Sequence, residues 1–411
     1  MAKPILIRNA RQLLTLHGLA TPRRGNALRE LGIICDGAVL IRDGLIREVG
    51  PSRRVEALAE ARNADEIDAG GCVVLPGFVD SHTHLVTGAK RPADGDGLQP
   101  RPEPWGTTIQ QTSQRTLEAR GLAVLEDFVR HGTTMIEAKS GFGFDQAGEL
   151  KILRTHAALN RRTSLLASTF MGTLWLPPDA SSADYIEWMC SSILPLLKRR
   201  RLAEFAGICC EPNVFSVEQA RRYLSVARQL GFIPKMHTGQ APNPGAVEEA
   251  VRLGAATVDH VVFVNDNDVE MLAGSHTIAT LLPGPVFFTG SGRYAPGRQL
   301  IDAGAAVALA TGYNPYTSPS QNMQMTIVLA CRKMGMTAAE AISAATINGA
   351  HAVRRAASRG SIEHGKAADL MILRIPDYRE IASHFGVNLV ETALLHGSVV
   401  FQRQKVNWPA A

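Results

Sequence analysis

The sequence predicts a (β/α)8 barrel that carries a small β-sandwich domain. Apolar runs of strand length alternate with helical patterns through the middle of the chain, whereas short alternating runs and turns occupy both ends. The chain has 411 residues, of which 45% are hydrophobic and 20% charged. This length and composition suit a soluble protein with one large α/β domain and one accessory domain.

The accessory domain is predicted from the texture of the two ends. Residues 38–41 and 45–49 are short apolar or alternating runs split by an Asp-Gly turn, which is typical of a β-hairpin. Similar runs return near the C-terminus. We therefore expect residues 1–75 and 360–411 to fold together, and residues 76–359 to form the barrel.

Eight strand candidates support the barrel, and helical patterns fill most of the gaps between them. One such helix is expected over residues 216–230, because Ser216 suits a helix start and Glu218 favours the first turn. Active sites of such barrels lie at the C-terminal ends of the strands, so polar residues there are the candidates for function. The strand candidates are residues 72–79, 133–140, 164–171, 205–211, 232–238, 257–263, 277–283 and 305–314.

Four histidines fall at the ends of these strands. His82 and His84 follow the first buried run, and side-chain alternation places them on one side. His237 and His260 end the fifth and sixth candidates. Any one histidine alone is more often an ordinary core residue, but four at one end of a barrel indicate a divalent metal site.

Bulk properties exclude several other classes of function. The net charge is only +5, and the densest basic run, residues 198–201, ends a helical pattern, so no nucleic-acid partner is expected. No long apolar segment or signal peptide is visible, so no membrane partner is expected. The six cysteines form no Cys-x-x-Cys pair, which suits reduced thiols in a cytoplasmic protein.

The histidine pattern and three longer phrases, at residues 131–143, 281–284 and 385–391, resemble the amidohydrolase superfamily. Within it the chain is most similar to the imidazolonepropionases, which open a cyclic amide ring. The likeness covers nearly the whole chain, and it implies an enzyme that often pairs as a homodimer.

The resemblance implies roles for individual residues. His82, His84 and His237 would bind zinc or iron, and His260 would lie beside the metal and position the reacting group. Arg91 matches an arginine that the family uses towards the substrate.

Three positions depart from the family pattern. Gly312 stands where the family has an aspartate that binds the metal and moves the proton of the attacking water. Thr173 replaces a substrate-facing histidine, and Phe142 stands where a tyrosine is common. Metal-assisted hydrolysis still needs a base near the water, and glycine supplies none. Imidazolonepropionase activity itself is therefore not expected.

Other groups are then candidates for moving the proton. Regular alternation turns Asp259 away from the pocket if His260 faces it. Glu137 and Glu211 end other strands and are better placed, while Tyr316 would serve as an acid. The predicted catalytic residues are His260, Glu211 and Tyr316. The predicted substrate-binding residues are Arg91, Phe142, Thr173, Gln240, Tyr313 and Asn314.

The sequence thus predicts an enzyme that acts on C–N bonds of a small, polar, nitrogen-containing ring, either opening or closing a cyclic amide. One alternative is a non-hydrolytic enzyme on the same scaffold, such as an isomerase, lyase or cyclase. The other alternative is a non-catalytic protein that binds a small molecule.

Overall fold

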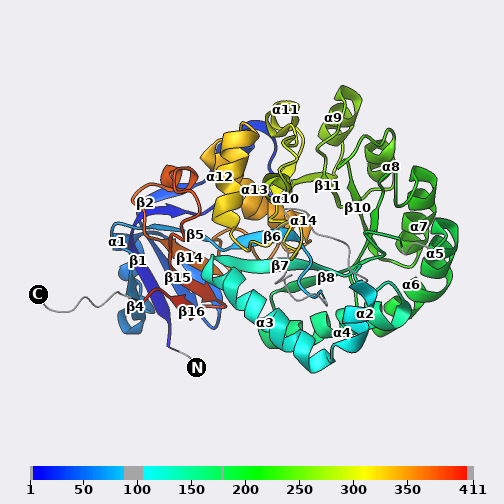
Figure 1. Cartoon of the computed structure of the whole chain (residues 1–411). Helices are drawn as coiled ribbons and strands as arrows, with labels where there is room; N and C mark the ends of the chain where they lie inside the picture. The colour runs from blue at the N-terminus through cyan, green and yellow to red at the C-terminus, as the bar shows by residue number, and fades with distance from the viewer. Residues whose placement is uncertain (1–2, 88–104, 177–179, 405–411) are drawn as a thin grey trace, which may run out of the picture.

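A computed structural model describes residues 3–87, 105–176 and 180–404 (Figure 1). It contains a parallel eight-stranded barrel surrounded by helices and, beside it, a mixed β-sheet made from both ends of the chain. The predicted fold class is therefore confirmed. None of the helices in the described part of the chain combines the length and apolar character needed to cross a membrane.

The barrel strands pair in sequence order, and every pairing is parallel. The ring is nearly closed where the first strand meets the last: Thr83 bridges to Tyr313, and the backbone N–H of His84 donates to the Tyr313 carbonyl at 2.7 Å. We call this junction the seam. The strands are β6 (Phe78–Thr83), β7 (Thr133–Lys139), β8 (Leu166–Met171), β9 (Phe205–Cys209), β10 (Ile233–Thr238), β11 (Thr257–His260), β12 (Ile278–Leu281) and β13 (Val307–Leu309).

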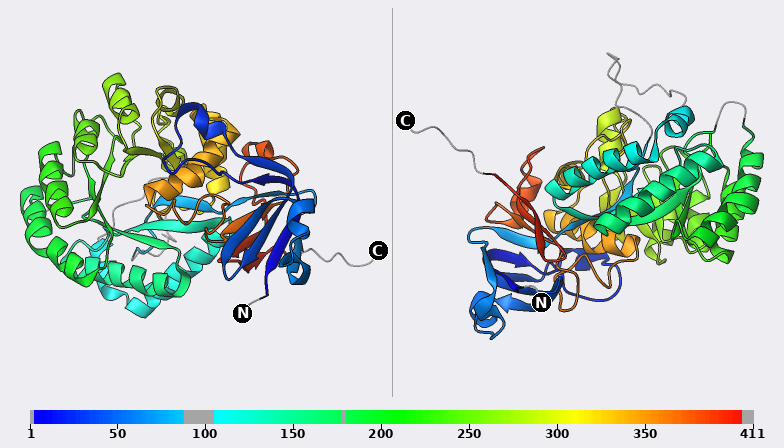
Figure 2. Two further views of the ribbon diagram at one scale, coloured as in Figure 1. Left: turned by 180° about the vertical axis from the view of Figure 1, so that it is seen from behind. Right: turned by 90° about the horizontal axis from the view of Figure 1, so that it is seen from below.

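Helices cover the outside of the barrel (Figure 2). The helix predicted over residues 216–230 is α7, where the Ser216 side chain caps the N-terminus and Gln219 completes a capping box. The helices are α2 (Trp105–Gln111), α3 (Gln114–Arg130), α4 (Gln146–Thr163), α5 (Ser182–Trp188), α6 (Leu194–Arg200), α7 (Val217–Gln229), α8 (Ala246–Arg252), α9 (Asp266–Ala273), α10 (Pro283–Thr289), α11 (Gly297–Asp302), α12 (Met323–Lys333), α13 (Ala338–Ala345) and α14 (Ile347–Ala352).

The accessory strands form one hydrogen-bonded sheet in which the two ends of the chain meet (Figures 1 and 2). The C-terminal strand β14 pairs with the N-terminal strand β5, and a shared core packs Leu13 and Ile41 with Leu370. The elements are β1 (Ile5–Leu14), β2 (Ile33–Arg42), β3 (Leu45–Pro51), α1 (Ser52–Glu56), β4 (Asp65–Asp68), β5 (Val73–Pro76), β14 (Leu370–Leu373), β15 (Val390–Leu395) and β16 (Ser398–Gln402).

The single strand predicted over residues 72–79 is wrong. It is two strands, because β5 belongs to the accessory sheet and β6 to the barrel, with Gly77 between them. A Cβ at Gly77 would collide with the Thr134 side chain on β7, so only glycine lets the chain cross here. Two consecutive buried strands read as one apolar run in the sequence.

Candidate active site

A cavity of about 480 Å³ opens at the C-terminal ends of the barrel strands. It brings together side chains from the ends of β6, β9, β10, β11 and the segment after β13. Seven of the predicted site residues line it, and so does Gly312. These seven are His82, His84, His237, His260, Glu211, Gln240 and Asn314.

Three of the four histidines form a compact buried group. One ring nitrogen from each of His82, His237 and His260 lies within 4.8 Å of the other two. The rings of His237 and His260 are closest, with 4.1 Å between centroids. His84 lies beside them, 5.6 Å from His82 between ring centroids, but is not in this group. Its assignment as a ligand stays a prediction, while His260 joins the candidate ligands.

The chemistry of this group fits a zinc-type metal. Burial lowers the pKa of all four histidines, to about 3 for His237, so the rings are neutral and present lone pairs. Nδ1 of His84 and of His237 is buried without a hydrogen-bond partner among the described residues. Buried nitrogens left without partners are unfavourable unless something else binds them, and imidazole is a common zinc ligand.

Asp259 is not among the described residues that line the cavity, in agreement with the prediction, but it contacts the histidine group from behind. Its Oδ2 lies 2.7 Å from Nδ1 of His82. Asp259 follows the inward alternation of β11, whereas His260 has a left-handed backbone with φ +81° that returns its side chain to the cavity. The irregular backbone lets two consecutive residues serve the same site.

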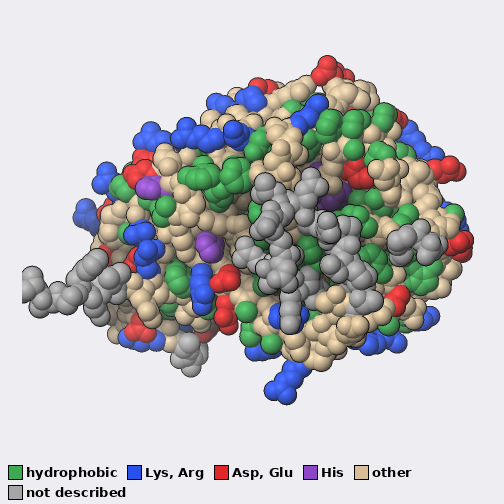
Figure 3. All heavy atoms as spheres, in the orientation of Figure 1, with side chains coloured by type: hydrophobic (Ala, Val, Ile, Leu, Met, Phe, Trp, Pro, Cys, Tyr) green, Lys and Arg blue, Asp and Glu red, His purple; other side chains and the backbone are tan. Residues whose placement is uncertain are grey.

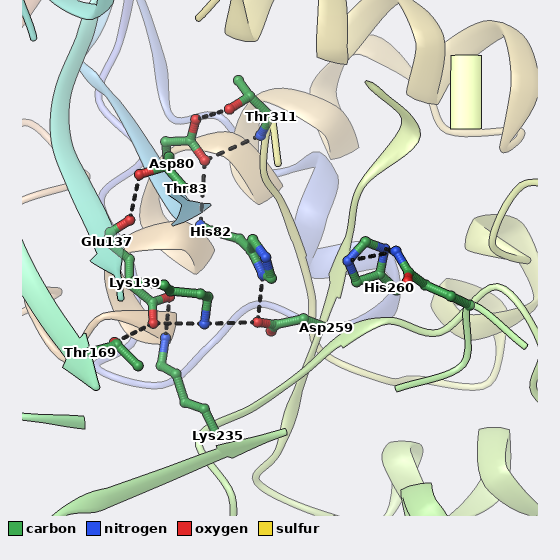
Figure 4. A network of polar contacts seen from close by, with 11 residues as sticks. Asp80, His82, Thr83, Glu137, Lys139, Thr169, Lys235, Asp259, His260 and Thr311 are labelled. Atoms are coloured by element: carbon green, nitrogen blue, oxygen red, sulfur yellow. Dashed lines mark hydrogen bonds and ion pairs between the residues drawn. The ribbon is translucent and has the colours of Figure 1, made fainter. Parts of the chain in front are cut away.

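A network of buried charges lies beside the histidines (Figure 4). Nζ of Lys139 is 3.1 Å from Asp259 Oδ2 and 2.8 Å from Glu137 Oε1, and Lys235 donates to Glu137 Oε2 at 2.7 Å. Burial alone would lower the pKa of Lys139, but Asp259 and Glu137 outweigh it and the pKa is raised. Burial would likewise raise the pKa of Asp259, but Lys139 and His82 hold it well below its usual value. Two carboxylates thus balance two ammonium groups.

Glu211 is the one carboxylate among the described residues that line the cavity. Its oxygens accept hydrogen bonds from the backbone N–H groups of Gln240, at 2.8 Å, and Ala241, at 3.3 Å. Burial raises its pKa. The other proposed carboxylate, Glu137, is bound to both buried lysines and does not reach the cavity.

The wall at strand eight is apolar. Gly312 has φ +65°, and a Cβ there would lie 2.9 Å from both Leu282 Cδ2 and Pro285 Cγ. Leu282 and Pro285 line the cavity where the resemblance implied a carboxylate. Asn314 fixes the following turn, since its Oδ1 accepts from the backbone N–H groups of Tyr316 and Thr317. The difference from the family pattern is therefore not confined to Gly312, because the side chains around it are apolar as well.

Below this wall, Asp80 joins the first strand to the last. Its Oδ1 accepts from the backbone N–H of Thr311 at 3.1 Å, and its Oδ2 from the Thr311 hydroxyl at 2.5 Å. Burial raises the pKa of Asp80 to about 7. Asp80 lies two residues before His82 on β6, so strand one carries both a histidine ligand candidate and a bond across the seam.

The remaining predicted residues lie around the cavity without lining it. The ring of Tyr313 packs against Phe128 on α3, with 5.4 Å between centroids. The Thr173 hydroxyl hydrogen-bonds to the Trp175 backbone. Tyr316 stacks on Phe142, with 6.2 Å between centroids. Arg91 falls outside the described residues.

A buried carboxylate holds the loop that carries Phe142. Glu149, in the first turn of α4, accepts hydrogen bonds from the backbone N–H groups of Gly141, at 3.1 Å, and Gly143, at 2.6 Å. The Phe142 ring between them packs against His84, with 5.0 Å between centroids. Burial raises the pKa of Glu149 to about 7.

The face of the molecule seen in Figure 3 carries charged and hydrophobic side chains in different places. On the face seen in Figure 3, Lys and Arg side chains lie mainly towards the edge, while hydrophobic side chains gather nearer the middle.

The fold and the site together indicate the class of protein to which the chain belongs. The barrel is parallel, it carries a buried histidine group at its strand ends, and it is joined to a sheet made from both termini. Models described as the amidohydrolase family match residues 65–162 and 211–394. The chain belongs to the amidohydrolase superfamily.

Within that superfamily the chain is similar to imidazolonepropionases. The imidazolonepropionase of Parabacteroides distasonis is 40% identical, over 96% of this chain and 98% of that protein. That of Geobacillus kaustophilus is 38% identical, over 98% of this chain and 99% of that protein. The chain is therefore an amidohydrolase-superfamily enzyme similar to imidazolonepropionase.

Solved structures at lower identity show the same fold. A triazine hydrolase variant has a TM-score of 0.74 at 17% identity, covering 98% of this chain and 95% of that one. An adenosine deaminase from Xanthomonas campestris, solved with bound zinc, has a TM-score of 0.69 at 18% identity, covering 97% and 93%.

Proposed function

We propose that this enzyme opens or closes a C–N bond in a small, polar, nitrogen-containing ring, with Glu211 moving the proton. The observation that carries the proposal is that Glu211 is the one carboxylate lining the cavity among the described residues, beside four histidines and opposite an apolar strand-eight wall. Ring opening adds water to the amide carbon and transfers a proton to the leaving nitrogen, so one acid–base group can serve both steps.

His82, His237 and His260 would hold zinc or iron, with His84 as a further candidate ligand. Such a cation, when bound, polarises a carbonyl and lowers the pKa of water. The residues of the chain then have separate roles. Gln240 Nε2 lies 3.2 Å from Nδ1 of His260, which places a polar amide between the histidines and Glu211.

Glu211 is suited to proton transfer by its fixed position and its raised pKa. Two backbone N–H groups at the end of β10 hold the carboxylate, so its direction does not depend on a flexible partner. Its raised pKa lies closer to neutral pH than that of an ordinary glutamate. A carboxyl group with such a pKa is better suited both to accept a proton and to return it.

The shape of the cavity favours a flat ring with polar edges. Leu174, Leu282 and Pro285 provide apolar walls, and Asn213 and Gln240 add amide side chains to the lining. A few polar groups in a mostly apolar cleft are the usual arrangement for small-molecule recognition. A homodimer and an interaction of Arg91 with the substrate stay predictions.

The test is to incubate zinc-loaded protein with hydantoin-type and imidazolone-type rings and to measure turnover. The mass of the product then shows whether a ring has been opened. Glu211→Gln keeps the shape of the side chain, and we expect it to lower kcat by about 10²- to 10⁴-fold while zinc content stays unchanged. Asn213→Ala, at the same cavity, should raise KM without a matching fall in kcat. Full activity in Glu211→Gln would rule out this role for Glu211.

A non-hydrolytic reaction is the second candidate, favoured by the apolar wall at Gly312, Leu282 and Pro285. It predicts exchange of substrate hydrogen with deuterated water, or isomerisation, without ring opening. A protein that binds such rings and returns them unchanged would instead be the non-catalytic binder.

A further inference from the structure

We propose that Lys139 is a positioning residue of the histidine site, which acts on His82 through Asp259. The inference rests on the proposed metal site, and it assigns a function to a buried lysine that does not line the cavity. Lys139 lies on β7, Asp259 on β11 and His82 on β6, so the contact chain crosses the interior of the barrel (Figure 4).

The contacts run through a single oxygen. Oδ2 of Asp259 lies 2.7 Å from Nδ1 of His82 and 3.1 Å from Nζ of Lys139. An ionised carboxylate only accepts, so Nδ1 of His82 carries the proton and Nε2 keeps the free lone pair. A carboxylate behind a metal-binding histidine commonly fixes its tautomer and ring orientation in this way.

Asp259 depends on Lys139 for its own position. Its second oxygen, Oδ1, is buried and has no hydrogen-bond partner among the described residues. Among the contacts described for its carboxylate, Lys139 is the one partner that does not belong to the histidine site. Without the ammonium group, the carboxylate would be held by His82 alone and could rotate away from Nδ1.

Lys139 is itself held rigidly. Glu137, two residues earlier on the same strand, lies 2.8 Å from its Nζ, and Glu137 also accepts from Lys235 and the Thr169 hydroxyl. Lys139 and Lys235 are each only 1% exposed. Among buried groups a charge that loses its partner is strongly disfavoured, so the geometry of the network is well determined.

Lys235 provides a matched control within the same network. It is equally buried and pairs with the same Glu137, but no hydrogen bond or ion pair joins it to Asp259 among the described residues, so it acts on that carboxylate only through its charge. If a buried lysine matters only for folding, the two lysines should be interchangeable in their effect on the site. If Lys139 acts through Asp259, only Lys139 should affect metal binding.

The experiment measures the zinc dissociation constant of the metal-free full chain by competition with a chromogenic chelator. We expect Lys139→Gln to weaken zinc binding by about 10- to 100-fold, the usual effect of losing an outer partner of a metal ligand. Lys235→Gln should change it by less than about threefold. Lys139→Gln in an Asp259→Asn background should have no further effect, because the connecting carboxylate is already altered.

Equal losses in the two lysine variants, or additive effects in the double variant, would overturn the proposal and leave a structural role. If circular dichroism shows that Lys139→Gln does not fold, Asp259→Asn is measured alone. A zinc affinity equal to that of the wild type in Asp259→Asn also overturns the proposal. Cobalt(II) spectra provide a second readout, because a reoriented His82 changes the visible bands. If the wild-type protein binds no zinc, the result refutes the proposed metal site itself, which is a separate claim from the role of Lys139.

Discussion

The two sides of the cavity differ in what supports them. On the histidine side, strands β6, β10 and β11 bring His82, His237 and His260 together, with a balanced layer of buried charges beside them. On the strand-eight side, Gly312 faces Leu282 and Pro285, and no ionisable side chain there lines the cavity among the described residues. The comparison indicates that metal binding and proton transfer need not come from the same wall of the barrel.

The largest effect should come from removing a histidine. We expect His237→Ala to weaken zinc binding by about 10³-fold, because a three-histidine site loses a direct ligand. Elemental analysis after dialysis measures it. His156→Ala is the control, since His156 is equally buried but lies away from the cavity. Unchanged zinc content in His237→Ala would show that the histidine side of the cavity does not hold the metal through His237.

The next effect tests the apolar side. Gly312→Asp should lower the free energy of unfolding by roughly 4 kcal/mol, because it combines positive-φ strain with a collision against Leu282 and Pro285. Gly290→Ala, at φ +68° with nothing nearby, isolates the strain and should cost only about 1 kcal/mol. Denaturant unfolding compares them. A stable Gly312→Asp enzyme with faster ring opening would show that the wall accepts a carboxylate.

A third prediction concerns how the free energy of unfolding depends on pH through Glu149, which holds the loop beside His84. The folded-state pKa of Glu149 is raised from 4.5 to about 7, so its contribution to stability is fully present below pH 4.5 and is lost as the pH rises through about 7. The loss should be on the order of 3 kcal/mol. Glu149→Gln should flatten this part of the stability profile in urea unfolding at several pH values. An unchanged slope would mean that Glu149 is ionised throughout.

The smallest effect belongs to the turn on the strand-eight side. Asn314→Ala should lower the free energy of unfolding by about 1–2 kcal/mol, because it leaves buried backbone groups of Tyr316 and Thr317 without partners. The loss should not vary between pH 5 and pH 8, since an amide does not titrate. Asn314→Asp keeps both acceptor bonds but sets a carboxylate oxygen against the Gly312 carbonyl, to which the amide donates at 2.9 Å, so it should not recover the full loss. A pH-dependent loss in Asn314→Ala would contradict this distinction from Glu149.

Much of the barrel follows from the sequence because buried parallel strands are continuous apolar runs. Strands β7 to β13 appear where such runs predict them, and alternation correctly places His82 and His84 at one cavity. Composition could not separate β5 from β6, since both are buried and only Gly77 marks the crossing.

The network around Lys139 was missed for a different reason. Lys235 precedes His237 by two residues, so strand alternation alone points both into the barrel, and this signal was available. The role of Asp259 was not available, because it depends on the left-handed backbone at His260, which no local pattern announces. The apolar wall at Gly312 also required three-dimensional packing, since Leu282 and Pro285 lie on the preceding unit.

The seam has a consequence for how the protein is made. β6 is the first barrel strand to be synthesised and β13 the last, so one edge of β6 has no partner until Tyr313, just after β13, has emerged. Unpaired edges of parallel sheets favour aggregation, and charged groups near an edge oppose it. Asp80, buried and bonded to Thr311 in the finished barrel, is hydrated and ionised before then. We expect the residue that closes the barrel to protect the nascent chain from misassembly.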